Sequence, residues 1–300
     1  MTTALTIGNF DGVHRGHAAL VEACRRHGEA VAMFFDPHPA EYFGRGGDGL
    51  LTTPARRAAW LRAGGASRVD IRPFDGEFAS QTPETFVKNV VVRDHGAQVV
   101  VVGPDFRFGK GAVGDVPALR AFGSELGFAV EIADAVLERD EVISSTRIRR
   151  ALLGGDVRHA AELLGRSYVV DSTVVKGDQR GRTLGFPTAN LGALSTIVPK
   201  DGVYAVAARV NGARLFGMAN LGARPTFEAG RSVEVHLFDF AADLYDAPIA
   251  VAFLARLRDE QKFDGLDALV AQLKADEREA RACIEKFGDL EASFAAYGTP

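Results

Sequence analysis

GNFDGVHRGH, residues 8–17, is the stretch that decides how the N-terminal half of this 300-residue chain folds. It follows the apolar run 4–7 and precedes the helix-like run 18–24, which predicts a strand, a glycine-containing turn and a helix N-terminus. Glycine lets a backbone approach a ligand closely, and a helix N-terminus presents free N–H groups to an anion. His14 and His17 lie three residues apart and point the same way on a first helical turn. We interpret the stretch as a cradle for a polyphosphate, against the alternative of a strand–helix turn that binds nothing.

Composition and charge limit the class of protein. Three hundred residues suggest about two domains, and 47% hydrophobic with 25% charged residues is typical of a soluble globular protein. The net charge of −4 does not favour nucleic-acid binding. No basic segment precedes an apolar core at the start, and no apolar run approaches the ~20 residues that span a bilayer, so we expect a cytoplasmic protein without a membrane or nucleic-acid partner. Cys24 and Cys283 are expected to be buried small hydrophobes, with no disulfide and no zinc spacing.

Short apolar runs alternate with helix-like stretches from residue 1 to about 135. We expect strands at 5–7, 30–35, 69–71, 99–102 and 129–132. Thr53-Pro54 and Thr82-Pro83 each place a capping hydroxyl before a proline at the first helical position, and Val116-Pro117 opens a further helix. The valine run at 99–102 suits a strand buried on both faces of a parallel sheet. The alternation predicts a doubly wound, Rossmann-like α/β domain over residues 1–165, with its ligand site beyond the carboxyl ends of the strands.

The second half has a different character. Asp156 caps a short helix over 157–164 that ends at Gly165, and β-like runs follow at 168–175, 203–210, 213–219, 233–240 and 248–254. Asn211-Gly212 between two of these runs predicts a type I′ hairpin. Short strands joined by turns predict a small antiparallel β-barrel or sandwich over residues 166–300. A terminal helix is expected over about 266–287, with an apolar face formed by Leu266, Leu269, Val270, Leu273 and Ile284.

Ordered motifs in both halves resemble one family, the bacterial bifunctional riboflavin kinase/FAD synthetases. The FMN adenylyltransferase module is matched by GNFDGVHRGH, FDPHP at 35–39, DFRFG at 105–109 and ISSTRIR at 143–149. The riboflavin kinase module is matched by KGDQRGRTLGFPTANL at 176–191, GMANLGARPTF at 217–227, EVHLFDF at 234–240, DLY at 243–245 and LRDEQKFD at 257–264. The resemblance covers about residues 5 to 288. It implies two reactions, riboflavin + ATP → FMN + ADP and FMN + ATP → FAD + pyrophosphate.

In the kinase module, Glu234 shares one face of an alternating strand with His236. Its carboxylate has the lone pairs to take the proton of the riboflavin 5′-hydroxyl, and the resemblance assigns it this role; the alternative is an exposed surface glutamate. Oxygen ligands such as those of Thr188 and Asn190 suit Mg²⁺, and the resemblance implies that both hold the metal and the nucleotide. The alternative is a tight turn that enters a strand. Residues expected at the ATP phosphates are Lys176, Gly177, Gly181, Thr183, Gly185, Pro187 and Asn190, and those at the flavin are Arg258 and Phe263.

In the adenylyltransferase module, the nucleophile is the phosphate of FMN, which is already anionic, so no base is required. Catalysis must come from positioning and from stabilising charge at the α-phosphate and the departing pyrophosphate, a role that fits His14 and His17. The resemblance implies nucleotide contacts from Gly8, Asn9, Phe10, Asp11, Gly12, Gly16, Asp105, Arg107, Ser145, Thr146 and Arg149, and flavin contacts from Pro37 and His38. The alternatives are a plain glycine loop at 103–111 and a solvated basic helix after residue 144. Mg²⁺ is expected at both sites, with ATP as co-substrate at both.

Two other functions are compatible with the motifs. One is an adenylyl- or cytidylyltransferase for another small phosphate ester, with a C-terminal half that only binds its ligand. The other is a flavin-binding regulator with degenerate sites. Intact His14, His17, Thr188, Asn190 and Glu234 argue against degeneracy.

Overall fold

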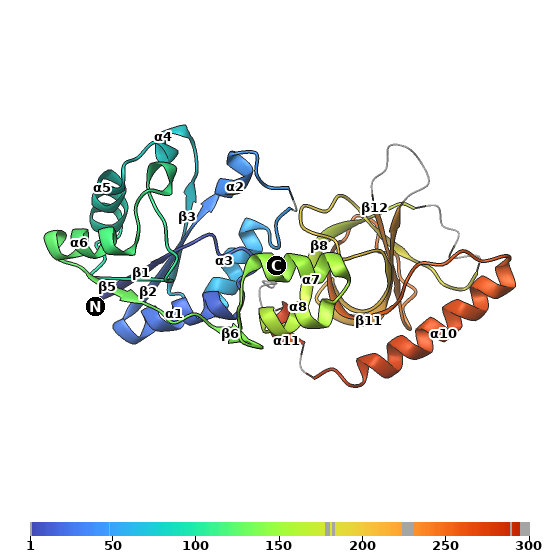
Figure 1. The fold of residues 1–300 in the computed structure, drawn as a ribbon. Helices are drawn as coiled ribbons and strands as arrows, with labels where there is room; N and C mark the ends of the chain where they lie inside the picture. Colours follow the sequence, from blue (N-terminus) through green and yellow to red (C-terminus); the bar gives the residue numbers. More distant parts are fainter. Residues whose placement is uncertain are drawn as a thin grey trace. The chain divides into compact units, whose positions relative to one another are not determined.

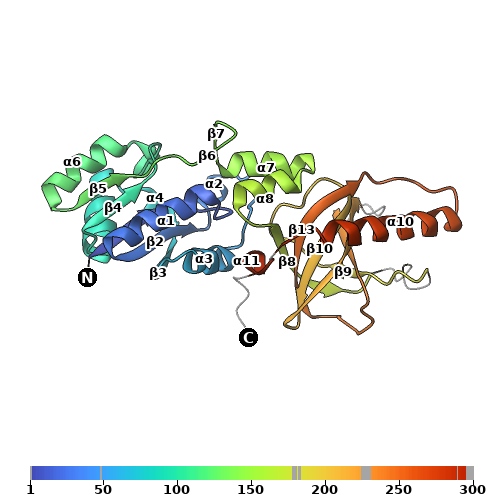
Figure 2. The same ribbon diagram turned by 90° about the horizontal axis from the view of Figure 1, so that it is seen from below.

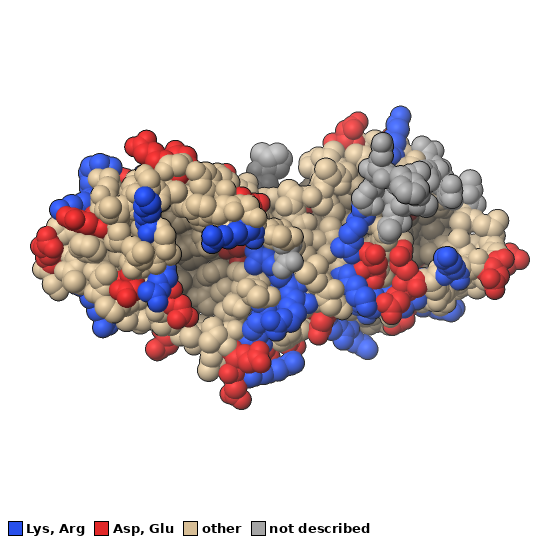
Figure 3. Space-filling view, turned by 45° about the horizontal axis from the view of Figure 1, so that its top comes forward, with Lys and Arg blue, Asp and Glu red and all other residues tan. Residues whose placement is uncertain are grey.

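The computed structural model describes residues 2–47, 49–177, 181, 184–223, 231–288 and 290–294. The chain forms two compact units, Met1–Ser145 and Thr146–Pro300 (Figure 1). Within the described residues we find no helix with the length and apolar character that crossing a bilayer requires. On the face drawn in Figure 3, basic and acidic side chains are interspersed over each unit.

The first unit is built on a five-stranded parallel sheet. Its strands lie in the order β3 (Arg68–Pro73), β2 (Glu29–Asp36), β1 (Thr3–Ile7), β4 (Val99–Val102) and β5 (Ala129–Ile132). Every pairing is parallel, and all five strands lie where the sequence predicts them, which confirms the doubly wound class. The strand order reverses beside β1, so the turn after β1 and the loop after β4 flank the place where such folds bind ligands.

Helices cover both faces of this sheet. One face packs Cys24 from α1 against Val101, and the other packs Val90 and Leu119 from later helices against Leu5. The helical segments are α1 (Arg15–His27), α2 (Pro39–Tyr42), α3 (Pro54–Ala63), α4 (Gly76–Ala79), α5 (Pro83–Phe86), the π-helix η1 (Val87–Asp94), the 3₁₀-helix η2 (Lys110–Ala112) and α6 (Val116–Leu126), and a hairpin of β6 (Leu137–Glu138) and β7 (Glu141–Val142) follows β5.

The capping predictions for this unit are confirmed. The hydroxyls of Thr53 and Thr82 accept backbone N–H groups at the starts of α3 and α5. Asp115 caps α6, which ends at Gly127 with a left-handed φ of 82°. The π-helical continuation of α5 was not predicted, because spacing of apolar residues does not separate a wider helical turn from an ordinary one.

The second unit contains a closed β-barrel, so the barrel alternative is confirmed over the sandwich. Its strands follow the order β10 (Gly202–Val210), β11 (Ala213–Ala223), β12 (Arg231–Leu237), β9 (Ala189–Leu191), β8 (Tyr168–Val175) and β13 (Pro248–Arg258). Helices α7 (Ser145–Gly154) and α8 (Val157–Leu164) come before it in the chain. Asn211 and Gly212 have φ values of 49° and 77°, the left-handed pair that a type I′ hairpin needs.

The terminal helix differs in part from its prediction. α10 spans Leu266–Ile284 and packs against β10, β11 and β13 (Figures 1 and 2). Leu266 was expected on the apolar face but is 66% exposed, because the helix begins beyond the barrel edge and first reaches full burial at Asp276. A short helix, α11 (Glu291–Phe294), follows, although no signal was found there. Cys24 and Cys283 are buried free thiols, as predicted.

Candidate functional site

The turn after β1 is held in an unusual backbone conformation. Phe10 and Val13 have φ values of 48° and 42°, in the left-handed region that non-glycine residues seldom enter, and Gly12 between them has 87°. The Gly8 N–H donates to the Met33 carbonyl of β2 at 3.1 Å. Because such conformations persist only when their surroundings enforce them, the contacts beneath the turn matter.

Asp11 supplies most of those contacts. Its carboxylate accepts hydrogen bonds from the backbone N–H groups of Leu51 and Thr52 at 3.0–3.1 Å and from the Thr52 hydroxyl at 3.1 Å. The guanidinium of Arg57 lies 3.3 Å from the same carboxylate, and the two side chains are 1% and 2% exposed. Arg57 also stacks over the ring of Phe34 at 4.9 Å. Asp11 was expected to contact the nucleotide, and the structure places its carboxylate under the turn, where it ties residues 8–17 to residues 51–57.

His14 and His17 cap helix α1 together. The His14 Nδ1 accepts from the His17 N–H and the His17 Nδ1 accepts from the His14 N–H, each at 3.3 Å. Their rings stack with centroids 3.5 Å apart at 18°, and the Phe10 ring meets His17 edge-on. Since both Nδ1 atoms accept hydrogen bonds, the neutral rings carry their protons on Nε2. The pair therefore offers two N–H donors at the positive end of a helix, as an anion site requires.

Other predicted residues of this unit lie around the turn. A Cβ at Gly16 would come within 3.1 Å of the His14 ring, so glycine leaves room for the stacked pair. The Ser145 hydroxyl donates to the Asp11 carbonyl at 2.8 Å, which places Ser145 of the ISSTRIR motif at the turn. Arg107, on the loop after β4 that also carries Asp105, lies 3.5 Å from Asp115. Asn9 is exposed, and Thr146 and Arg149 belong to α7 of the second unit.

An aromatic cluster at the same sheet edge was missed by the motif analysis. The Phe74 ring, directly after β3, lies 5.3 Å from Phe35 of β2, 5.3 Å from Tyr42 and 5.8 Å from Phe78. All four rings are partly exposed. Pro37 and His38 come after Phe35 and Asp36 in the chain, and the His38 Nδ1 caps α2 by accepting from the Ala40 N–H at 3.0 Å. The available signal was the position of Phe35 and Phe74 at the carboxyl ends of neighbouring strands.

The second unit has a cavity of about 340 Å³ beside its barrel. It brings together five of the site residues predicted from the sequence: Gly181, Thr188, Glu234, Arg258 and Phe263. Glu234 is half-buried on β12, which disagrees with the alternative of a plain surface glutamate. Leu269 and Leu273 of α10 close one side with apolar surface, while β12 presents polar groups on another. An apolar cavity with a few polar groups on one wall is typical of small-molecule sites.

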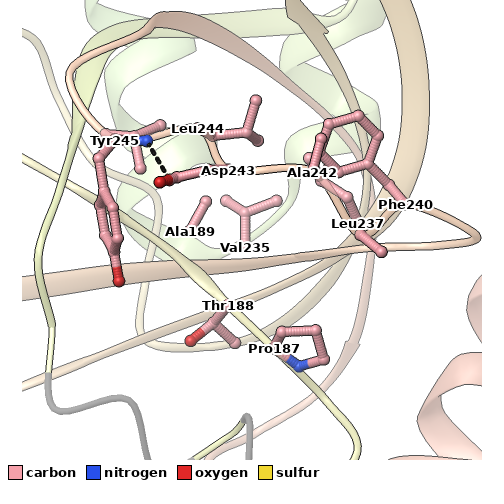
Figure 4. Close-up of a pocket in the computed structure, with 12 residues that line it drawn as sticks. Pro187, Thr188, Ala189, Val235, Leu237, Phe240, Ala242, Asp243, Leu244 and Tyr245 are labelled. Carbon is pink, nitrogen blue, oxygen red and sulfur yellow. Dashed lines mark hydrogen bonds between the residues drawn. The ribbon is translucent and has the colours of Figure 1, made fainter.

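A second cavity of about 230 Å³ is lined by residues 187–189 and by residues that follow β12 (Figure 4). Thr188 and Pro187 form one wall, and the DLY motif, Asp243 to Tyr245, lies opposite. The Lys176 ammonium lies 5.9 Å from the Tyr245 ring, which places it near this cavity. Thr188 lines both cavities, so it stands at the boundary between two ligand-sized spaces.

Glycines of the motif at 176–191 pack closely against residues that lie next to Thr188 and Glu234. A Cβ at Gly177 would lie 2.3 Å from the Asn190 Nδ2, and one at Gly181 would lie 2.3 Å from the Phe186 carbonyl oxygen. Gly185 has a left-handed φ of 82°. Thr183 lies outside the described residues.

Arg258 is engaged with helix α10. Its Nε and Nη2 donate to Asp276 at 2.9 and 2.6 Å, and Asp276 is 1% exposed. The guanidinium also lies 5.9 Å from the Phe263 ring. The pairing fixes α10 as a wall of the larger cavity, so Arg258 borders that cavity as part of an ion pair.

Comparison with known proteins assigns each half of the chain. A family model described as FAD synthetase matches residues 1–147, and one described as Riboflavin kinase matches residues 164–284. The matched ranges and the compact units divide the chain somewhat before residue 165, and the domain boundary at 165/166 stays a prediction.

Whole-length relatives agree with these matches. The curated bifunctional riboflavin kinase/FMN adenylyltransferase of Escherichia coli (strain K12) is 40% identical over 285 residues, 92% of this chain and 91% of that protein. Its namesake in Bacillus subtilis (strain 168) is 36% identical over 302 residues, 96% of this chain and 93% of that one. A crystal structure from Streptococcus pneumoniae, described as a macrolide-efflux protein, superposes with a TM-score of 0.83 at 34% identity and covers 93% of this chain and 94% of its own.

Proposed function

The chain belongs to the family of bifunctional riboflavin kinase/FMN adenylyltransferases, and on this premise we propose which side chains carry each of its two reactions. The C-terminal module transfers the γ-phosphoryl group of ATP to riboflavin and yields FMN and ADP. The N-terminal module joins FMN to the adenylyl group of a second ATP and yields FAD and pyrophosphate. Both reactions consume ATP, and the cytoplasm is the compartment proposed for them.

In the kinase module, riboflavin occupies the larger cavity and ATP the smaller one. The observation that carries this assignment is the shared wall: Thr188 lines both cavities, and Glu234 lines the larger one. The riboflavin 5′-hydroxyl and the γ-phosphate meet beside Thr188. Glu234 takes the hydroxyl proton while the oxygen bonds to the γ-phosphorus and the bond from that phosphorus to ADP breaks.

The oxygen atoms at this wall fit Mg²⁺. Thr188 offers a hydroxyl oxygen and Asn190 an amide oxygen, and Mg²⁺ takes few protein oxygens while keeping waters and phosphates. Glycine at position 177 leaves space for the Asn190 amide. When bound, the ion neutralises charge on the ATP phosphates, and these two side chains hold it.

In the adenylyltransferase module, the FMN phosphate attacks the α-phosphorus of ATP and pyrophosphate leaves. The Nε2–H donors of His14 and His17, together with the first N–H groups of α1, stabilise the negative charge that develops on these phosphates. Asp11 acts indirectly, by holding the strained turn in place. Mg²⁺ is proposed here too, beside phosphate groups, without a ligand assignment.

The flavin of this module rests on the aromatic cluster of Phe35, Tyr42, Phe74 and Phe78. An isoalloxazine ring is flat and apolar on its faces, and partly exposed aromatic rings give it a stacking surface. Pro37 and His38 adjoin this surface, which is consistent with their expected flavin contacts.

The test is to incubate the purified chain with riboflavin, ATP and Mg²⁺ and to separate the flavins by chromatography. FMN should appear first and FAD after it, and unchanged riboflavin would leave only a binding function. Glu234→Ala should stop FMN formation but still convert supplied FMN into FAD, while His17→Ala should do the reverse. If one substitution stops both reactions in a folded protein, the assignment of two separate sites is wrong.

A further inference from the structure

We propose that His236 is a positioning residue of the kinase module, which holds the Pro187 carbonyl and so places Thr188 relative to Glu234. His236 lies two residues after Glu234 on β12 and lines the same cavity. The inference rests on the proposed assignment of riboflavin phosphorylation to that cavity. It concerns a side chain that has no part in the chemistry described above.

The backbone pairing stops one residue short of Thr188. β12 pairs with β9 at Glu234–Asn190 and Val235–Ala189, and continuing that register would place His236 opposite Thr188. Pro187 has no N–H group with which to extend a ladder. Instead, the His236 Nδ1 lies 2.8 Å from the Pro187 carbonyl oxygen. A side-chain hydrogen bond therefore continues the attachment of this segment to β12.

This hydrogen bond fixes the state of the ring. A carbonyl oxygen only accepts, so the proton must lie on the Nδ1 of His236. In the neutral ring, Nε2 then carries no proton. This is the opposite tautomer from that of His14 and His17, whose Nδ1 atoms accept.

The ring also packs against the residue before Pro187. Its centroid lies 5.2 Å from that of Phe186, at 60°, and 5.8 Å from that of Phe238. The Phe186 N–H in turn donates to the Gly181 carbonyl at 2.9 Å. One imidazole thus contacts both residues that lead into Thr188 and, through Phe186, supports the glycine motif.

The expected consequence is on rate more than on binding. Thr188 lies at the boundary of the two cavities, so a shift of this segment changes the approach of the hydroxyl to the phosphate. A misplacement of about 1 Å can cost on the order of 10²-fold in rate. The riboflavin cavity keeps its other walls, so affinity for riboflavin should change little.

The experiment compares His236→Ala with His236→Asn in the full chain. The side-chain amide of Asn places an N–H near the position of the imidazole Nδ1–H. His236→Ala should lower kcat for FMN formation roughly 30- to 100-fold with less than a threefold change in the riboflavin KM. His236→Asn should recover at least tenfold of that loss, and both variants should still make FAD from supplied FMN. The proposal is overturned if Ala keeps the wild-type kcat, if Asn is no better than Ala, or if only KM changes.

A second measurement is independent of activity. Nitrogen NMR of the labelled wild-type chain should show the His236 ring protonated on Nδ1, and an Nε2–H tautomer would overturn the proposal. Failure of the proposed kinase function has a different signature, since the wild-type chain would then make no FMN while the tautomer stayed as stated.

Discussion

Glu234 and Asn190 face each other as register partners across the antiparallel pairing of β12 and β9. Directly opposite residues in such a pair hold their Cβ atoms about 4.5–5.5 Å apart, on one face of the sheet. The proposed base and a proposed metal ligand are therefore set at a fixed distance by the backbone. Neither residue depends on a long flexible segment for its place.

Gly177→Ala should displace Asn190 from its position opposite Glu234, although Gly177 lies outside β9 and β12. The added Cβ would lie 2.3 Å from the Asn190 Nδ2, while Gly177 has no left-handed φ, so the effect is steric and acts through Asn190. We expect FMN formation to fall roughly tenfold to hundredfold and the Mg²⁺ requirement to rise. The measurement is the initial rate of FMN formation over a Mg²⁺ titration.

Gly154→Ala is the matched control for this change. Nothing lies within 4 Å of a Cβ built at Gly154, which sits in the same unit on α7. Its kinase rate should equal that of the wild type. A Gly177→Ala protein that keeps full activity would show that Asn190 does not need its present position.

Most of the strands were predictable from the sequence because they are local. The valine run of β4 and the Asn211-Gly212 hairpin can each be predicted from a few consecutive residues. β9 was anticipated only as a strand after a tight turn at Thr188, without bounds or partners, since three residues carry no periodicity and its pairing with β12 and β8 joins distant parts of the chain. The exposure of Leu266 was not predictable either, because it depends on where α10 meets the barrel, which is a tertiary contact.

The sites divide in the same way. Motif resemblance assigned Thr188 and Glu234 to the kinase reaction, and both residues line the same cavity. The motif resemblance did not indicate that the Asp11 carboxylate holds the turn in place, because its partner Arg57 lies 46 residues away in the sequence. The aromatic cluster also joins separate segments, so only tertiary structure shows that its rings touch.

His14→Asn should separate capping from phosphate stabilisation. The Asn oxygen accepts the His17 N–H as the His14 Nδ1 does, but no donor remains in place of Nε2–H. We expect unit stability within about 0.5 kcal/mol of wild type, since Asn is a preferred cap. FAD formation from supplied FMN should fall on the order of 10²-fold, as for the loss of one donor to developing charge.

The comparison variant is His14→Ala, which loses both functions. It should be as slow as His14→Asn and less stable by about 1 kcal/mol. If His14→Asn makes FAD at the wild-type rate, the donor role of this histidine is wrong.

Asp11→Ala should destabilise the first unit strongly. The change leaves the buried Arg57 guanidinium without its carboxylate, and breaking a buried pair costs about 3–5 kcal/mol. Trp60 is the only tryptophan of the chain and lies buried on α3, the helix that carries Arg57, so its fluorescence in urea reports this unit. The control is Glu22→Ala, which breaks a shorter but exposed ion pair with Arg25 at 2.6 Å and should cost under about 1 kcal/mol. Equal losses in the two variants would contradict the importance of burial.

Acid should weaken the first unit through His95. Burial lowers the pKa of His95 below its ordinary 6.5, and the nearby Asp70 carboxylate, 3.2 Å from Nε2, opposes that shift only in part. Between the folded pKa and 6.5 the unfolded chain binds more protons than the folded one, so the free energy of unfolding falls as the pH drops through that window. Above 6.5 the contribution is fully present.

The measurement is urea unfolding followed by Trp60 fluorescence at about pH 7.5 and about pH 5.5, in the wild type and in His95→Leu. Leu is uncharged at both pH values and occupies a similar volume, so part of the pH dependence should disappear in the variant. Arg68, Arg72 and Asp94 also act on the His95 ring and are unchanged by the substitution. A variant that loses as much stability on acidification as the wild type would assign the acid sensitivity to the carboxylates of this unit instead of His95.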